Sequence, residues 1–146
     1  IKNKKLRIDF AILRIFNLYG PKQEKQNIIP DIKEKILNNK NDKIKIIHPK
    51  TSRDFLFIDD LINLILKCTK QKKLNNEVYE VGTGIGTSLE KVYKEVRKIL
   101  KKTVEFEYNN PPYDKIRHTK AYIGKTKQKF KWKPHFKLKK GLKKIL

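Results

Sequence analysis

Short apolar runs alternate along the chain with stretches in which apolar residues recur at the spacing of a helix. This order constrains the fold more than any other feature. The first run, FAILRIF at 10–16, is apolar on both faces, as is typical of a parallel strand that helices cover on both sides. Two later runs, at 55–58 and 78–81, each lead into a helical pattern. The sequence therefore predicts an α/β fold, and its 146 residues are most simply one domain.

The helix predicted after the run 55–58 has an unusual pattern. Its residues 61–66, LINLIL, are apolar nearly all round, so we expect this helix to be buried between two layers. Asp59 stands where an N-cap belongs, and Asp60 places a negative charge near the positive end of the helix dipole. Both carboxylates are therefore expected to stabilise the start of the helix.

The formal net charge of +22 invites a nucleic-acid interpretation, but two observations oppose it. Only five of the 37 basic residues are arginine, the residue that base and phosphate readers favour. The lysines are also spread from end to end, as expected if they fill solvent-facing positions. We therefore expect no nucleic-acid partner, while a basic module that binds polyanions remains the alternative function.

Other features of the composition exclude several classes of protein. The one cysteine, Cys68, cannot form an internal disulfide, which fits a cytoplasmic protein. No apolar run reaches the roughly 18 residues that cross a bilayer, so no membrane partner is expected. The three histidines share no ligand spacing, so no metal site is expected. Because the sequence contains no methionine and begins at Ile1, we expect it to be part of a longer protein.

Three closely spaced glycines, Gly82, Gly84 and Gly86, stand between a strand pattern and a helical pattern. A dinucleotide-binding turn requires Gly-x-Gly-x-x-Gly, but Thr87 occupies the position of the third glycine here. One interpretation is a cofactor cradle, and the other is a tight structural turn whose glycines supply positive φ. The spacing favours the structural turn.

Five sequence blocks match a known family in their order and separation: LRIFNLYGP, NIIPDI, SRDFLFIDDLINLIL, EVYEVGTGIGTSLEKV and KAYIGKTKQKFKWKP. From Ile12 to Leu142 the chain resembles the C-terminal half of the extended short-chain dehydrogenase/reductase family, the UDP-glucose 4-epimerase-like nucleotide-sugar epimerases and dehydratases. The resemblance implies the substrate-binding part of a Rossmann-type NAD(P)-binding fold. Residues 1–146 would be a single partial domain, with the N-terminal cofactor-binding half absent. In that family the glycine-rich cofactor turn belongs to the N-terminal half, so 82–86 is expected to be structural.

The resemblance also implies that the chemistry lies elsewhere. Family enzymes use a Tyr-x-x-x-Lys pair to remove a proton from a sugar hydroxyl while hydride passes to NAD. The pair is absent here, because Tyr19, Tyr93 and Tyr113 are followed four residues later by glutamine or arginine. We therefore expect no catalytic residue in this chain, expect NAD to be bound mainly by the absent half, and expect the isolated chain to be inactive.

Two asparagines are candidate substrate-binding residues. Asn17 follows the first predicted strand, where α/β sheets bind ligands, and its amide can donate to a phosphate or sugar oxygen. Asn27 lies at a predicted helix entrance, where free N–H groups attract anions. The resemblance places both on the nucleotide sugar and places the cofactor near Ile15 and Pro21. The alternatives are a loop asparagine that stabilises its own turn and a plain helix cap.

Arg53 is the strongest single candidate, because a guanidinium fork can hold the paired oxygens of a diphosphate in a way that lysine cannot copy. The resemblance places Arg53 on the pyrophosphate, makes Arg117 a second clamp and puts Asp114 near the sugar. The spacing of Asp114 and Arg117 is one residue longer than the usual family pattern. The alternative for Arg53 is a surface ion pair.

The resemblance implies that the chain is the nucleotide-sugar-binding portion of an NAD-dependent epimerase or dehydratase, with a 4-epimerase preferred over a 4,6-dehydratase. The expected partners are a nucleoside diphosphate sugar and the absent N-terminal half, and the whole enzyme is a candidate homodimer. Two alternatives stay open: a basic module that binds polyanions or nucleic acid, and the non-functional product of a split gene.

Overall fold

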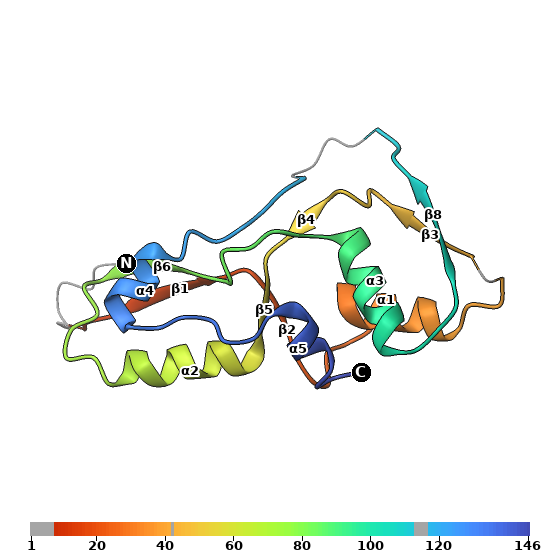
Figure 1. The fold of residues 1–146 in the computed structure, drawn as a ribbon. Coiled ribbons are helices and arrows are strands. Elements are labelled where there is room, and N and C mark those ends of the chain that lie inside the picture. The colour runs from red at the N-terminus through yellow and green to blue at the C-terminus, as the bar shows by residue number, and fades with distance from the viewer. Residues whose placement is uncertain (1–7, 42, 113–116) are drawn as a thin grey trace.

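The computed structural model describes residues 8–41, 43–112 and 117–146. Strands and helices alternate through most of this part of the chain, which confirms the predicted α/β class (Figure 1). The strands are β1 (Ala11–Ile15), β2 (Asn17–Tyr19), β3 (Lys43–Ile47), β4 (Ser52–Arg53), β5 (Phe55–Phe57), β6 (Glu77–Val81), β7 (Thr87–Ser88) and β8 (Glu105–Asn109). The helices are α1 (Ile28–Leu37), α2 (Ile58–Thr69), α3 (Leu89–Ile99), α4 (Gly124–Phe130) and α5 (Leu138–Leu142).

Most of the strand pairs are parallel. β1 pairs with β6, β2 with β5 and β3 with β8, all parallel, whereas β4 pairs with β7 in the antiparallel sense. β1 and β2 form one extended path that changes its partner. The Phe16 N–H donates to the Val81 carbonyl at 2.9 Å, and the next N–H, of Asn17, donates to the Asp54 carbonyl at 3.1 Å. Asn17 therefore lies at the point where the path leaves β6 and joins β5.

Two apolar clusters stabilise the fold, one toward each end of the molecule (Figure 1). In one, Leu61 and Leu64 of α2 pack against Tyr79 and Val81 of β6. In the other, buried side chains of α1, α3 and β3 meet: Ile32, Ile36, Ile46, Val92 and Val96. Figure 1 shows β2 and β5 between these two ends, so the change of strand partner occurs where the two clusters approach each other.

The start of α2 differs from the prediction. The helix begins at Ile58, with Phe57 as its N-cap residue, so Asp59 is inside the first turn and is not the cap. The Asp59 carboxylate instead lies 2.9 Å from the Lys144 ammonium group. The strand β5 passes directly into the helix, which leaves no loop residue between them for a side-chain cap.

Asp60, the next residue, connects the C-terminal segment to α2. Its buried carboxylate accepts the N–H groups of His135 at 2.8 Å and Phe136 at 3.0 Å. Its main-chain carbonyl accepts the Trp132 indole N–H at 3.0 Å. Burial, with a smaller contribution from Asp60, raises the pKa of the Tyr19 phenol well above its usual value, so this core tyrosine stays neutral. One carboxylate thus fixes a segment that lies more than 70 residues away in sequence.

α2 and β1 are covered less completely than their apolar patterns predicted. Leu61 and Leu64 are buried, but Ile12 of β1 is exposed. A neighbouring stripe of α2 is exposed as well: Ile62, Ile65 and Leu66. The prediction of full cover is therefore wrong for the described residues, because the elements that contact α2 and β1 bury one side of each.

Replacing Asp60 with alanine should destabilise the fold, because two main-chain N–H groups lose a buried charged acceptor. We expect the free energy of unfolding to fall by about 2–4 kcal/mol. Urea denaturation followed by circular dichroism measures this change. Asp59→Ala is the matched control: it removes a half-exposed ion pair with Lys144 and should cost less than about 1 kcal/mol. Equal losses in the two variants would show that Asp60 does not fix the C-terminal segment.

Candidate functional site

Asn17 occupies the position that the sequence predicts, just past the end of a parallel strand. It follows β1, and it pairs with Phe55 in the register of β2 and β5. Its N–H donates to the Asp54 carbonyl at 3.1 Å, and its side-chain amide points to the same oxygen at 3.5 Å. The carboxyl ends of parallel strands form the edge at which open α/β sheets bind ligands. Asn17 therefore lies just past the carboxyl end of β1 and beside Asp54, the residue that follows Arg53.

Arg53 and Arg117 lie beside each other. The Ser52 N–H donates to the Arg117 carbonyl at 2.9 Å. The Arg53 guanidinium donates through Nη1 to the same carbonyl at 3.1 Å and to the Ser52 carbonyl at 2.9 Å. Arg53 is half-buried in β4, and Arg117 is exposed. Because Asp54, which accepts the Asn17 N–H, directly follows Arg53, the structure brings Asn17, Arg53 and Arg117 together on adjacent main-chain segments.

Asn27 is the N-cap residue of α1, but its side chain does not cap the helix. Its main chain is extended, with φ −86° and ψ 151°, and its side-chain amide donates to the Glu24 carbonyl at 3.2 Å. Its own carbonyl accepts the Asp31 N–H at 3.0 Å. Asp31 also places a negative charge in the first turn, where it interacts favourably with the helix dipole. Asn27 therefore caps α1 through its main-chain carbonyl and not through its side chain.

The other predicted residues do not line the same cavity as Arg117. Ile15 ends β1 opposite Val81, and its side chain is exposed. Pro21 follows β2 and lines a separate cavity beside α1. Asp114 lies outside the described residues.

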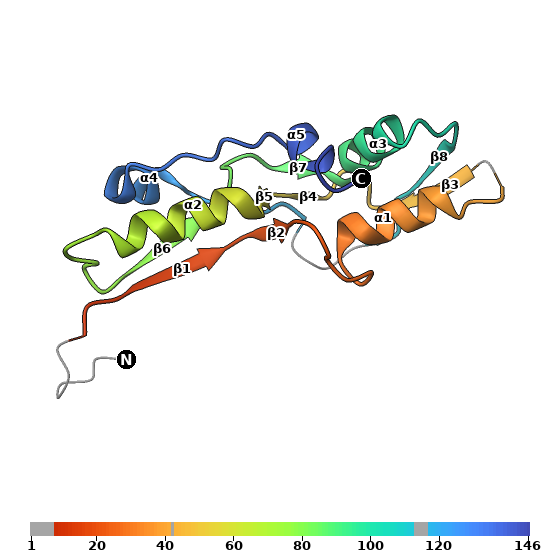
Figure 2. The same ribbon diagram turned by 90° about the horizontal axis from the view of Figure 1, so that it is seen from below.

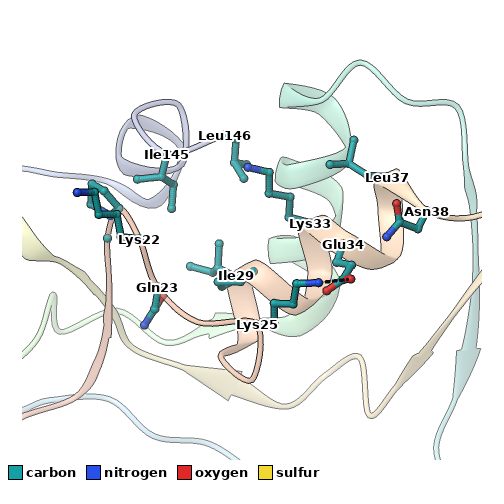
Figure 3. Close-up of a pocket in the computed structure, with 13 residues that line it drawn as sticks. Lys22, Gln23, Lys25, Ile29, Lys33, Glu34, Leu37, Asn38, Ile145 and Leu146 are labelled. Atoms are coloured by element: carbon teal, nitrogen blue, oxygen red, sulfur yellow. Dashed lines mark hydrogen bonds and ion pairs between the residues drawn. The ribbon is translucent and has the colours of Figure 1, made fainter.

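The cavity at Pro21 has a volume of about 420 Å³ (Figure 3). Its apolar lining includes Ile29, Leu37, Ile145 and Leu146, and three lysines also line it: Lys22, Lys25 and Lys33. The Lys25 ammonium lies 2.9 Å from the Glu34 carboxylate, and Figure 3 shows this pair over α1. None of Asn17, Arg53 and Arg117 lines this cavity, so it is separate from the group that they form.

A second cavity, of about 540 Å³, opens beside Arg117. The described residues that line it are His48, Lys50, Thr51, Asn110, Pro111, Pro112, Arg117 and His118. The parallel strands β3 and β8 both end at this cavity, because His48 and Asn110 directly follow them. The His118 ring nitrogen Nδ1 lies 3.0 Å from the Ser52 hydroxyl, which joins the cavity to β4. Cationic side chains at the carboxyl ends of parallel strands can bind an anionic ligand.

Asp54 connects this region to the glycine turn 82–86. Its fully buried carboxylate accepts the Thr83 hydroxyl and the N–H groups of Thr83 at 2.8 Å, Gly84 at 2.8 Å and Ala121 at 3.1 Å. Gly84 has φ +76°, a left-handed conformation that favours glycine. At Gly82 a Cβ atom would lie 2.6 Å from the Asp54 carboxylate. The N–H groups of the turn thus hold an internal carboxylate, which confirms the structural turn. Of its three glycines, however, Gly84 alone supplies the predicted positive φ.

Asp54 is the site residue that the sequence analysis did not identify. Its position before the apolar run Phe55–Phe57 is a signal, because a carboxylate that enters a buried strand needs hydrogen-bond partners. Those partners lie 29, 30 and 67 residues away in sequence, and no spacing rule connects them. Asp54 therefore positions Asn17 and Arg53 without having a recognisable motif of its own.

The described part of the chain offers neither a group of metal ligands nor an activated thiol. Among residues 8–41, 43–112 and 117–146, no group of three His, Cys, Asp or Glu side chains could hold a metal ion. In the same residues, no helix has the length and apolar character needed to cross a membrane. Burial raises the pKa of the Cys68 thiol, which makes it a weaker nucleophile.

Comparison with known proteins gives a family match. The profile of the NAD dependent epimerase/dehydratase family matches residues 2–82, more than half of the chain. CDP-abequose synthase of Salmonella typhimurium is 31% identical over 145 residues, which make up 95% of this chain and 48% of that protein. The chain thus spans about half the length of the curated relatives that it matches along most of its own length.

The similar solved structures are also about twice as long as this chain. UDP-glucose 4-epimerase of Thermotoga maritima, with UDP-glucose, matches with a TM-score of 0.81 and 27% identity over 94% of this chain and 45% of that chain. dTDP-glucose 4,6-dehydratase of Bacillus anthracis, in complex with NAD, matches with a TM-score of 0.77 and 26% identity over 92% of this chain and 42% of that chain. The similar proteins therefore include both epimerases and dehydratases.

Gly82→Ala should destabilise the chain, because the new methyl group would collide with Asp54 and with the Ala121 Cβ at 2.7 Å. We expect the free energy of unfolding to fall by about 1–3 kcal/mol, the usual cost of overpacking a dense site. Urea denaturation measures the effect. Gly124→Ala is the matched control, since its methyl group meets only the exposed Tyr122 ring at 3.3 Å and should change the stability by less than about 0.5 kcal/mol. A Gly82→Ala protein as stable as the control would contradict the tight closure of the turn on Asp54.

Proposed function

This chain belongs to the NAD-dependent epimerase/dehydratase family, and we propose that it forms the nucleotide-sugar-binding part of such an enzyme. The observation that carries the proposal is the grouping of Asn17, Arg53 and Arg117. Hydrogen bonds of Ser52 and Asp54 join their main-chain segments, and Asn17 lies just past the carboxyl end of the parallel strand β1. Two guanidinium groups on adjacent segments suit a diphosphate, whose paired oxygens each accept a guanidinium fork.

The chain's own residues would bind and orient the substrate. Arg53 and Arg117 hold the diphosphate, and Asn17 donates from its side-chain amide to a phosphate or sugar oxygen. The cavity beside Arg117 accepts the nucleoside. Asn27 and Asp114 remain predicted contacts of the same ligand. With the diphosphate fixed in this way, the sugar is held in one orientation toward the second half of the enzyme.

The reaction itself would take place at the boundary with that second half. NAD, bound mainly by the N-terminal half and near Ile15 of this chain, would supply the hydride acceptor for oxidation at the sugar C4. The proton acceptor must also come from the other half, because this sequence has no Tyr-x-x-x-Lys pair. The isolated chain is therefore proposed to bind substrate without turning it over.

A 4-epimerase is favoured over a 4,6-dehydratase as the whole enzyme. The preference rests on the match to the Thermotoga maritima UDP-glucose 4-epimerase, which has a TM-score of 0.81. The scores alone do not separate the two reactions, because a second UDP-glucose 4-epimerase matches with 0.76 and the dehydratase with 0.77. Both reactions begin with the same oxidation of the sugar, so the binding role of this chain is the same in either case. Only the fate of the ketone differs.

Arg53→Ala should weaken the binding of UDP-glucose to the chain about 10–100-fold, because a half-buried guanidinium loses charge-assisted hydrogen bonds to the diphosphate. Isothermal titration calorimetry measures the affinity, and urea denaturation checks that the variant is folded. Arg53→Lys should not restore the affinity, since an ammonium group cannot form the paired bonds. Arg14→Ala is the matched control, because this exposed arginine pairs with Glu80 at 3.5 Å outside the site.

The same titrations separate the proposal from a basic polyanion-binding module. A polyanion binder loses affinity steeply as salt is added and responds alike to Arg53→Ala and Arg14→Ala. A nucleotide-sugar site prefers UDP-glucose to inorganic phosphate and responds to Arg53→Ala alone. Unchanged binding of UDP-glucose by the folded Arg53→Ala variant would overturn the proposed function.

A further inference from the structure

A further cavity, of about 550 Å³, lies between the glycine turn, α3 and the segment that joins α4 to α5. Figure 2 shows α5, β7 and α3 near one margin of the molecule and β1 near the opposite one. Among the described residues, neither Asn17, Arg53 and Arg117 nor any other residue of the cavity beside Arg117 lines it. We call it the lysine cavity, after five of the residues that line it: Lys91, Lys127, Lys133, Lys137 and Lys139. It is therefore separate from the candidate site.

The lysine cavity carries an excess of positive charge. Its five lysines are exposed, and Glu95 is the one acidic residue among the described residues that line it. Elsewhere in the chain lysines pair with carboxylates, as Lys35 does with Asp31 and Lys94 with Glu90. Within the described part of the chain, none of the five cavity lysines forms an ion pair. Lining charges of one sign raise the local potential, so the cavity should attract an anion.

Glu95 has a carboxylate oxygen that is buried without a hydrogen-bond partner. The atom is Oε2, and no donor reaches it from the described residues. An acceptor buried in this way costs free energy, and a ligand that supplies an O–H or N–H group removes the cost. Glu95 lines the lysine cavity and also a cavity of about 730 Å³ with Lys98 and Lys102. The ligand at Glu95 should therefore carry a donor, and substitutions of the lysines can distinguish the two cavities.

Apolar side chains form a further part of the lining. Ile85 of the glycine turn is 62% exposed, and Phe136 and Leu138, at the approach to α5, are half-buried. The cavity volume of about 550 Å³ falls within the range of about 300–1,000 Å³ that is usual for small-molecule sites. The lining thus suits a small molecule that combines apolar surface, negative charge and a hydrogen-bond donor.

Two buried carboxylates fix the main chain at two parts of this lining. Asp54 accepts the Thr83 N–H at 2.8 Å and so holds the glycine turn. Asp60 accepts the N–H groups of His135 and Phe136 and so holds the segment between α4 and α5. Because this main chain is fixed before a ligand arrives, less ordering entropy is lost on binding. The cavity therefore has the fixed frame of a ligand site and is more than a group of surface lysines.

We propose that the lysine cavity binds a free nucleotide, at a site separate from the one proposed for the nucleotide sugar. The phosphates contact the lysine ammonium groups, which act as point charges and need no paired geometry. The base packs against Ile85 and Phe136, and an amino group of the base or a ribose hydroxyl donates to Glu95 Oε2. Inorganic triphosphate would satisfy the lysines alone, and a phosphorylated sugar would leave the apolar side chains uncovered. This inference goes beyond the proposed function and does not rest on it.

Titration of the chain with ATP tests the site. Isothermal titration calorimetry is done at about 150 mM salt, where surface charges are screened beyond about 8 Å, and we expect one ATP to bind per chain. Lys91→Ala combined with Lys137→Ala should lower the affinity at least about tenfold, because two charge-assisted contacts to phosphate are lost. The matched control is Lys98→Ala combined with Lys102→Ala. It removes the same charge from the other cavity that Glu95 lines and should leave the affinity for ATP unchanged.

Glu95→Ala distinguishes a nucleotide from other polyanions. Loss of this carboxylate removes a repulsive charge, so the affinity for inorganic triphosphate should rise. The affinity for ATP should instead fall about threefold or more, because the donor group of the nucleotide loses its acceptor. Urea denaturation checks that each variant is folded. A rise in affinity for both ligands would show that the cavity takes phosphate alone and would overturn the assignment to a nucleotide.

Three other results would overturn the proposal. They are the absence of saturable ATP binding, an equal loss of affinity in the two double variants, and ATP binding that Arg53→Ala abolishes. The second result would assign the binding to the overall charge or to the cavity at Lys98, and the third would assign it to the candidate site. Unchanged binding of UDP-glucose by the Arg53→Ala variant would remove the proposed function alone, so the two proposals can fail separately.

Discussion

The buried carboxylate of Asp54 is the interaction on which the rest of the site depends. It holds the N–H groups of Thr83, Gly84 and Ala121, which come from two segments distant in sequence, while its main-chain carbonyl accepts the Asn17 N–H. A buried charge is tolerated only when its hydrogen bonds are satisfied, so the glycine turn and the segment at Ala121 must close on it for the fold to be stable. Asn17 and the neighbouring Arg53 are positioned as a consequence. The glycine turn that resembles a phosphate cradle thus uses the same donor geometry to hold a side chain of the protein itself.

The sequence predicted the parts of this fold that depend on local pattern. The α/β alternation and the structural glycine turn are both confirmed, because apolar periodicity and glycine φ preference act over a few residues. The N-cap at Asp59 was wrong because β5 runs into α2 without a loop. The prediction that both faces of β1 are covered was wrong for the described residues. An apolar pattern indicates that a face is to be buried, but it does not indicate which part of a protein buries it. Of the candidate site, Asn17 and Arg53 stay predictions that rest on the family resemblance together with strand ends and residue chemistry. Asp54 could not be predicted, since its partners are set by tertiary contacts alone.

Most of the large positive charge comes from lysines that lie outside the candidate site. Lysine is concentrated on α1, α3, α4 and β3, and the clamp that we propose for the diphosphate is built from two of the few arginines. Long-range attraction between a basic surface and an anionic nucleotide sugar raises the rate of encounter and decreases with salt, while paired hydrogen bonds at short range determine which anion stays. In the proposed site, lysines would therefore provide the long-range charge and arginines the specificity.

The two arginines of the proposed clamp differ in how far the fold fixes their side chains. Arg53 is half-buried, and its Nη1 donates to the Ser52 and Arg117 carbonyls, so little side-chain entropy remains to be lost on binding. Arg117 is exposed, so in the proposed clamp its guanidinium would move onto the diphosphate after Arg53 has placed it. A clamp of this kind recognises the diphosphate and not the sugar, because its contacts lie away from the reacting carbon. Selection of the sugar and of its chemical fate would then belong to the other half, which explains why one C-terminal architecture is shared by an epimerase and a dehydratase among the similar structures.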